Sequence, residues 1–172
     1  IEECLRPFAQ ERETLSTIPG VKDQGIAKVI GEIGVKMKPW PDAKHLASGS
    51  GICPGHRESA GKHKRCGIRR GNGWLNSALV EAAWAATRKR ECALSGQFFR
   101  LRARLGPKKA LVAVAHSILV ILYECLSHGK TYQELGHDYF DRAQKRALTD
   151  RYVRRLRDLG YEVSLTAKED AA

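Results

Sequence analysis

A single serine stands among cationic side chains in the stretch HRESAGKHKRCGIRRGN, which runs from His56 to Asn72. The hydroxyl of Ser59 could attack a phosphodiester, because cationic neighbours hold a phosphate in place and stabilise the charge that develops on its oxygens. We expect Arg57 and Lys62 to be the nearest phosphate contacts. More remote steering of the strand is expected from Arg65, Arg69 and Arg70, and Lys64 is a further candidate nucleic-acid contact.

The residue types alone leave the role of this serine open. In the simpler interpretation, a serine in a basic loop only contacts phosphate or solvent, and catalysis needs a proton acceptor as well. His56 and His63 are both candidates for that base, and their spacing from Ser59 does not choose between them. Gly61 would let the backbone come close to a strand. The stretch therefore predicts a phosphate-binding loop, which is catalytic only if the serine is activated.

The same region contains two pairs of potential zinc ligands. Cys53-x2-His56 and His63-x2-Cys66 have ligand types that bind zinc tetrahedrally. The surrounding cations disfavour a divalent metal, and no second pattern supports the site. We predict no metal site in this chain, and a small zinc-stabilised adaptor is kept as an alternative.

A helical hairpin is indicated by TIPGVKDQGIAKVIGEIG, Thr17 to Gly34, in which Pro19-Gly20 is a turn signal and apolar residues follow at helical spacing. The glycine turn and the helix N-terminus of a helix-hairpin-helix can hold a phosphate. Gly20 and Lys22 are therefore candidate nucleic-acid contacts. Lys22 stands where this motif usually has a second glycine, so a plain helix-turn-helix core element fits equally well.

The charge of the whole chain favours a polyanionic partner. The 172 residues carry a formal net charge of +11 with a pI of about 9.7, and clustered positive charge is typical of nucleic-acid binding, although a merely solubilising surface is the alternative. The 5 cysteines are widely spaced and no leader is visible, which indicates a reducing cytoplasm and, with DNA as partner, association with the nucleoid. The apolar run from Ala110 to Leu126 is interrupted by polar residues and predicts a core helix, with no membrane partner.

The elements that must position these residues are expected to be mostly α-helical, in a compact domain that combines the hairpin with a basic glycine-rich loop. Pro7 should kink a polar helix over residues 1–16, Asp42 should cap a short helix, and Asn72 should start a longer one. That helix is expected to run to Arg88-Lys89-Arg90. Its predicted apolar stripe consists of Trp74, Leu75, Ala78, Leu79, Ala82, Ala83 and Ala86.

The second half of the chain predicts further helices. Residues 95–106 should form a short one with a basic face, and Pro107 should open a long one to about Ser127. Residues 128–136 are expected to be a turn, residues 138–159 one or two amphipathic helices, and residues 161–165 a stray strand. The acidic end of the chain is expected to be disordered.

A string of motifs in one order adds to this interpretation: LSTIPGV, IGEIG, LASGSGICPG, ESAGK, GN, WLNSALVEAAWAA and FFRLRARLGPKKALVAVAHSILVILYECLSHGKTY. In this order they resemble the C-terminal transposase domain of the insertion sequence 110 family, also called the 116/110/902 type. The likeness covers roughly residues 15 to 135.

The resemblance implies a DNA transposase or recombinase with two halves. The C-terminal half supplies a serine nucleophile, which here would be Ser59 in ESAGK, and the serine forms a covalent link to a cut DNA strand. An N-terminal RuvC-like half carries four acidic residues that bind magnesium. Members also use a structured guide RNA and work as homodimers or homotetramers.

The chain departs from that family pattern, because it shows no spaced acidic tetrad. Asp23, Glu32 and Asp42 are better interpreted as surface and cap residues. We expect residues 1–16 to be the tail of a linker helix from a missing RuvC-like domain, residues 17–135 to be the catalytic-serine domain, and residues 136–172 to be a helical extension with a disordered tail. No cofactor is then expected in this fragment, which would be inactive alone. A non-catalytic helix-hairpin-helix binding module is the alternative function.

Overall fold

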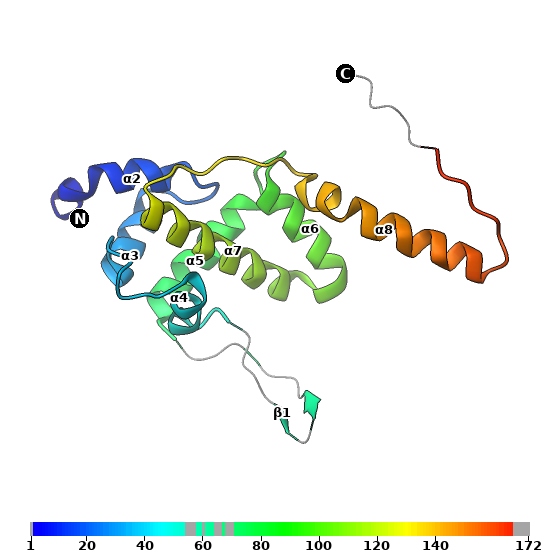
Figure 1. Ribbon diagram of the computed structural model, residues 1–172. Helices are drawn as coiled ribbons and strands as arrows, with labels where there is room; N and C mark the ends of the chain where they lie inside the picture. The colour runs from blue at the N-terminus through cyan, green and yellow to red at the C-terminus, as the bar shows by residue number, and fades with distance from the viewer. Residues whose placement is uncertain (1, 54–57, 60, 64–66, 68–70, 167–172) are drawn as a thin grey trace.

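The computed structural model describes residues 2–53, 58–59, 61–63, 67, 71–166 of the chain (Figure 1). This part is mostly helical, as predicted. Its elements, in chain order, are α1 (Glu2–Leu5), the 3-10 turn η1 (Arg6–Phe8), α2 (Ala9–Ser16), α3 (Asp23–Ile33), α4 (Ala43–Ser50), β1 (Glu58–Ser59), β2 (Lys62–His63), α5 (Gly73–Ala86), α6 (Ala93–Leu105), α7 (Pro107–His128) and α8 (Tyr139–Asp158).

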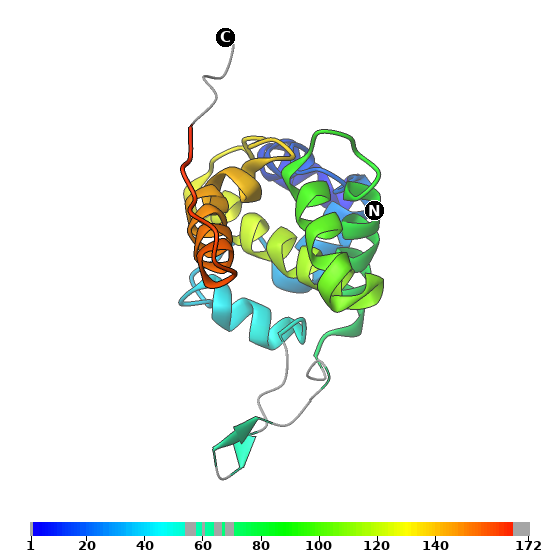
Figure 2. The same cartoon turned by 90° about the vertical axis from the view of Figure 1, so that its right-hand side faces the viewer.

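Helix α7 forms the centre of the protein. It packs against α2, α4, α5 and α6 (Figure 2), and Val114, Ile118 and Leu122 on its inner face are fully buried. Pro107 occupies the first turn, as predicted, where its missing N–H costs no helical hydrogen bond. By length and hydropathy alone α7 could cross a membrane, but its contacts with four helices identify it as the predicted core helix.

The predicted helical hairpin is formed by α2 and α3, and the predicted interruption at Pro7 is also observed, as η1. Gly20 turns the chain with φ of +84° and packs against the backbone of α5. Arg12 and Asp23 form an ion pair of 2.9 Å that ties α2 to the first turn of α3. Their hydrogen bond lowers the pKa of the Asp23 carboxyl. Packing against α5 thus holds the turn of the hairpin, and the Arg12–Asp23 ion pair holds its two helices together.

Helix α5 begins at the predicted cap but differs from the prediction in two ways. Trp74, expected on the apolar stripe, is 73% exposed. Leu75 beside it and Ala78 one turn further along are both buried, so the core covers one side of the first turn and leaves the Trp74 side open. The helix also stops at Ala86, before the basic triplet that the sequence predicts as its end, and Glu91 after it has φ of 56°.

The segment between α7 and α8 is a strap instead of the predicted turn (Figure 1). It runs back over the body, where the Tyr132 backbone N–H donates to Thr17 Oγ1 at 3.0 Å. Glu134 Oε1 accepts the backbone N–H of Ala93 at 2.8 Å, and those of Leu135 and Gly136 as well. The strap therefore caps the N-terminus of α6 with a residue from 41 positions further along the chain.

Replacing Glu134 by alanine should lower the free energy of unfolding by about 1–2 kcal/mol, because the buried N–H of Ala93 loses its acceptor. Partial burial raises the pKa of Glu134, but hydrogen bonds from Ala93, the Cys92 thiol and Gly136 outweigh it, and the net shift is downward. A lowered pKa stabilises the folded state above the ordinary glutamate value of about 4.3 and loses that effect as the pH falls through the folded value. Denaturant titrations at pH 7 and pH 3.5 check this.

The difference in the free energy of unfolding between wild type and Glu134→Ala should become smaller as the pH falls. Glu134→Gln keeps an acceptor oxygen without the charge, so its free energy of unfolding at pH 7 should lie between those of wild type and Glu134→Ala. An Ala variant as stable as wild type at pH 7 would contradict the role of this cap.

The C-terminal part forms one helix, α8, which extends away from the body (Figure 1). Its apolar residues do not pack into the core: Tyr152 is 57% exposed and Leu159 is 67% exposed. The strand expected at residues 161–165 is wrong, since residues 161–166 have no regular secondary structure. The expectation for the last residues falls on 167–172, which lie outside the described part.

Candidate nucleic-acid interface

The basic stretch forms a loop whose two ends meet between α4 and α5. The last turn of α4 and the start of α5 are so close there that a Cβ on Gly71 would overlap the backbone of Ser50 and Gly51. The loop therefore leaves and re-enters the body at one place. Figure 1 shows β1 and β2 standing apart from the helices beyond this point.

Ser59 is the last residue of β1 and belongs to a small antiparallel hairpin. The register pairs Glu58 with His63 and Ser59 with Lys62. Gly61 in the connecting turn has φ of +71°, a conformation that tight hairpin turns need and that glycine adopts without strain. This part of the basic glycine-rich loop is therefore a β-hairpin, and the serine lies directly before the hairpin turn.

Few of the other predicted site residues lie in the described part of the chain. Arg57, Lys64, Arg65, Arg69 and Arg70 lie outside the described residues, so their role as phosphate contacts stays a prediction. The same holds for His56 as base and for the zinc pairs, in which His56 and Cys66 are also outside. Cys53 is a half-buried free thiol, and the described residues contain no group of three metal-ligating side chains.

The hairpin residues Gly20 and Lys22 occupy different environments. Gly20 lies against Ala82 and Ala86 of α5, which gives it a packing role. Lys22 is exposed and immediately precedes the first turn of α3. Its side chain could meet a phosphate, although Asp23 adds a negative charge beside it. Contact with nucleic acid stays a prediction for both residues.

The helix that follows the loop begins at a fixed point. Asn72 Oδ1 accepts the backbone N–H groups of Trp74 and Leu75 at 3.0 and 3.1 Å, which is a helix N-cap. Its Nδ2 donates to Glu32 of α3. The sequence predicts Glu32 as a plain surface residue, but it is the group that ties this cap to the hairpin. The contact spans 40 residues, so no local pattern signals it.

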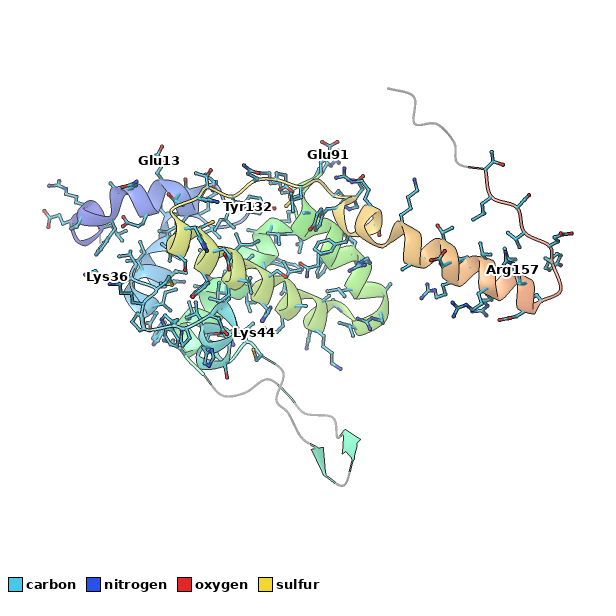
Figure 3. The ribbon with its side chains drawn as sticks, in the orientation of Figure 1. Glu13, Lys36, Lys44, Glu91, Tyr132 and Arg157 are labelled. Carbon is cyan, nitrogen blue, oxygen red and sulfur yellow. The ribbon has the colours of Figure 1, made fainter. Side chains whose placement is uncertain are left out.

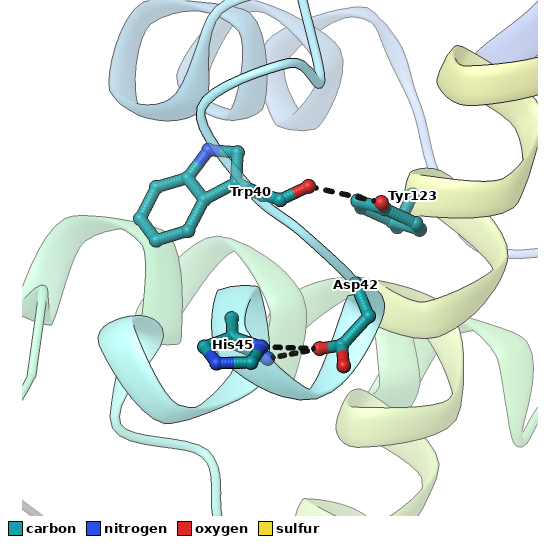
Figure 4. A network of polar contacts seen from close by, with 4 residues as sticks. All are labelled: Trp40, Asp42, His45 and Tyr123. Atoms are coloured by element: carbon teal, nitrogen blue, oxygen red, sulfur yellow. Dashed lines mark hydrogen bonds and ion pairs between the residues drawn. The ribbon is translucent and has the colours of Figure 1, made fainter.

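The helix that precedes the loop is fixed as well (Figure 4). Asp42 Oδ1 accepts the backbone N–H of His45 at 2.7 Å and lies 2.7 Å from its ring Nδ1. The backbone hydrogen bond is the main cause that lowers the pKa of Asp42. Tyr123 of α7 donates its hydroxyl to the Trp40 carbonyl at 3.0 Å. Both helices that carry the loop are therefore capped and tied to the body.

A groove of about 710 Å³ opens beside the base of the loop. It lies between α6 and α7, and its lining includes Gly67 of the loop, the apolar Val112 and the two lysines Lys108 and Lys109. Burial lowers the pKa of His116, so that side chain is neutral near pH 7. Sequence reasoning placed this segment in a core helix and missed its exposed basic start, which GPKK could have signalled.

The arrangement is suited to holding a nucleic-acid strand. A basic loop rises from a rigid base, a serine precedes its turn, and a groove with two lysines lies beside that base. Backbone phosphates are the partners that such cations select. Attack of a hydroxyl on a phosphodiester needs the hydroxyl and such cations at the same phosphate, because the cations stabilise the charge that develops on its oxygens.

Comparison with known proteins gives two matches. The profile of the family described as "Transposase IS116/IS110/IS902 family" matches residues 12–97. The chain is 27% identical over 138 residues to the pilin gene-inverting protein of Moraxella bovis, and the alignment covers 78% of this chain but 42% of that protein. The profile match spans half of the chain, from α2 through the loop to α6. The chain therefore belongs to the transposase IS116/IS110/IS902 family.

Proposed function

We propose that this protein is a DNA transposase or recombinase in which Ser59 is the nucleophile for strand cleavage. Family membership supports a role in DNA recombination, and the relative's name describes inversion of a gene. The observation that carries the proposal is the register of the hairpin, which sets Ser59 opposite Lys62 and directly before the Gly61 turn. The backbones of Ser59 and Lys62 are therefore neighbours across the hairpin.

In the proposed step, Ser59 Oγ attacks a backbone phosphorus and its proton passes to a base. A new O–P bond forms between serine and DNA, the bond from phosphorus to one deoxyribose oxygen breaks, and that oxygen takes up a proton. The phosphate stays a diester, so a hydroxyl from another strand can reverse the link and join the strands. Lys62 and the basic residues of the loop offset the developing negative charge.

The proposal includes partners and groups that the family resemblance implies. These are a magnesium-binding RuvC-like half, a structured guide RNA, and assembly into dimers or tetramers in the cytoplasm at the nucleoid. The described residues do not fit a magnesium site, because no three acidic or other metal-ligating side chains converge among them. No step of the chemistry is therefore derived through the metal.

Peptide mapping tests the proposal directly. Trypsin cleaves after Arg57 and Lys62, which releases Glu58–Lys62, and Ser59 is the one hydroxyl residue in this peptide. The full product of the gene is incubated with a labelled DNA substrate, trapped by denaturation, and digested with nuclease and trypsin. We expect a nucleotide mass on ESAGK. A nucleotide on another peptide, or recombination without any adduct, would refute the serine mechanism and favour the non-catalytic binding module for this domain.

A further inference from the structure

Trp74, in the first turn of α5, is the most exposed large apolar side chain in the described part of the chain, at 73%. A lone apolar residue on a surface is common, so this exposure alone indicates no function. Trp74 differs because the helical pattern of α5 predicts it in the core, while the fold leaves it in solvent. Functional sites are where a local sequence pattern and the fold are expected to disagree. The position of Trp74 in the fold therefore decides what it can do.

Trp74 lies at the foot of the basic loop, where the loop re-enters the body. It comes three residues after Gly71, whose backbone packs against Gly51 at the end of α4. The hairpin that carries Ser59 stands clear of the side chains of the helical body (Figure 3). A strand that follows the loop towards the body therefore reaches it at this foot, between the end of α4 and the first turn of α5.

The backbone that carries the indole is held in place. Asn72 Oδ1 accepts the backbone N–H of Trp74 at 3.0 Å, and Asn72 Nδ2 donates to Glu32 of α3. The first turn of α5 is thus tied to a neighbouring helix. An aromatic side chain on a fixed backbone loses little conformational entropy when a partner covers it, so most of the contact energy appears as affinity.

The surroundings of the indole fit a partner the size of one ring. Its neighbours on the exposed side of α5 are Gly73, Ser77 and Glu81, which offer no apolar side chain. A protein partner, including a second copy of the chain, needs a wider patch that excludes water around such an anchor. The carboxylate of Glu32 beside the cap disfavours a phosphate at this point, but not the uncharged face of a nucleobase.

We propose that Trp74 stacks on an unpaired base of the DNA strand that the basic loop engages. This inference rests on the proposed action on DNA but not on the role of Ser59. Tryptophan offers a large flat surface, and every base has a face that can stack on it, whatever the sequence. Bases inside an intact duplex stack on one another, so an unpaired strand is what offers a free face. Trp74 holds the opened strand at the foot of the loop, while the cations of the loop hold its phosphates.

The test compares Trp74→Ala with wild type in the 172-residue chain. Binding to a single DNA strand of about 20 nucleotides is followed by fluorescence anisotropy across a salt series. Affinity should fall by about 5- to 150-fold, which is the effect of losing one stacked base. The slope of log K against log salt should stay the same, because no phosphate contact is lost. Trp74→Phe keeps a smaller aromatic ring and should recover most of the affinity.

Trp84→Ala is the matched control. Trp84 lies about 15 Å further along the same helix, is 48% exposed, and has the Arg88 guanidinium 5.5 Å from its ring centre. Its loss should change the affinity by less than about twofold, because this ring lies away from the loop and contacts no base. A strand of abasic sugar-phosphates offers no base, so wild type and Trp74→Ala should bind it equally. Circular dichroism and thermal unfolding check that all variants are folded.

The inference would be overturned by any of the following results: no binding of single-stranded DNA by wild type, unchanged affinity in Trp74→Ala, equal losses in Trp74→Ala and Trp84→Ala, a loss that comes with a shallower salt slope, or an equal loss on the abasic strand. The Ser59 adduct is measured separately. An adduct on Ser59 with unchanged affinity in Trp74→Ala rejects the stacking alone, whereas the expected loss of affinity without an adduct rejects the serine mechanism alone.

Discussion

Replacing Ser59 by alanine is expected to abolish the covalent DNA–protein link and to lower the rate of strand exchange by at least about 10³-fold. The change removes the attacking oxygen and leaves every cation of the loop in place. Most of the binding free energy for a nucleic-acid backbone comes from phosphate neutralisation, so DNA affinity should change by less than about threefold. Adduct formation on denaturing gels and anisotropy on the same DNA measure the two quantities.

Two further variants make this result specific. Ser77→Ala removes a hydroxyl from the exposed side of α5 and should leave the adduct unchanged. Lys62→Gln removes the cation that the ladder sets opposite Ser59 and should slow the adduct by about 10- to 100-fold without abolishing it. Adducts of normal yield in Ser59→Ala would assign the link to another residue, and a normal rate in Lys62→Gln would remove Lys62 from charge stabilisation.

Local signals in the sequence predict most of the fold correctly. Asp42 and Asn72 cap their helices through side-chain oxygens that accept N–H groups two or three residues away. Pro107 starts α7, and Pro19-Gly20 turns the hairpin. Each of these features involves residues only a few positions apart, so the local residue types are enough to predict it.

Contacts between distant segments could not be predicted in the same way. Glu134 caps α6 from 41 residues away, and Glu32 holds Asn72 from 40 residues away. No periodicity or spacing carries such information. The prediction that places Trp74 in the core is wrong, because helical periodicity gives the direction of a side chain but not whether another element covers it. The predicted apolar side of α8 fails for the same reason.

The candidate site was predicted in part. The presence of a loop at these residues follows from their basic, glycine-rich composition. The position of Ser59 directly before the Gly61 turn comes from the structure. The pairing of Ser59 with Lys62 depends on register, which a two-residue strand does not reveal in sequence. The groove with Lys108 and Lys109 depends on how α6 and α7 pack, and only the structure shows it.

Replacing Gly20 by alanine is expected to lower the free energy of unfolding by about 3 kcal/mol or more. A Cβ at this position would overlap the Ala82 carbonyl oxygen and lie 2.7 Å from the Ala86 nitrogen. Both atoms belong to the backbone of a helix and cannot give way as a side chain end does, so overpacking costs about 1–3 kcal/mol. The φ of +84° adds about 1–2 kcal/mol for a residue with a side chain.

Two other glycines separate the clash from the backbone strain. Gly34 has φ of +69° and ψ of −174°, a conformation that is essentially restricted to glycine, and open space where a methyl group would lie. Gly34→Ala should therefore cost only the backbone strain of about 1–3 kcal/mol. Gly25 lies within α3 with open space and an ordinary helical conformation, and Gly25→Ala should stabilise the protein by about 0.5–1 kcal/mol. Thermal and denaturant unfolding of the three variants measure this order of stabilities, in which Gly25→Ala is the most stable and Gly20→Ala the least stable.

The order of these variants matters for function as well as for stability. If the turn at Gly20 serves mainly to seat the hairpin on α5, Gly20→Ala should weaken DNA binding only in proportion to the fraction unfolded. If Gly20 also contacts phosphate, as its motif predicts, affinity should fall at temperatures where the variant is still fully folded. A Gly20→Ala variant as stable as Gly34→Ala would contradict the close packing of the hairpin against Ala82 and Ala86, because both glycines have a positive φ and the clash with α5 is what sets Gly20 apart.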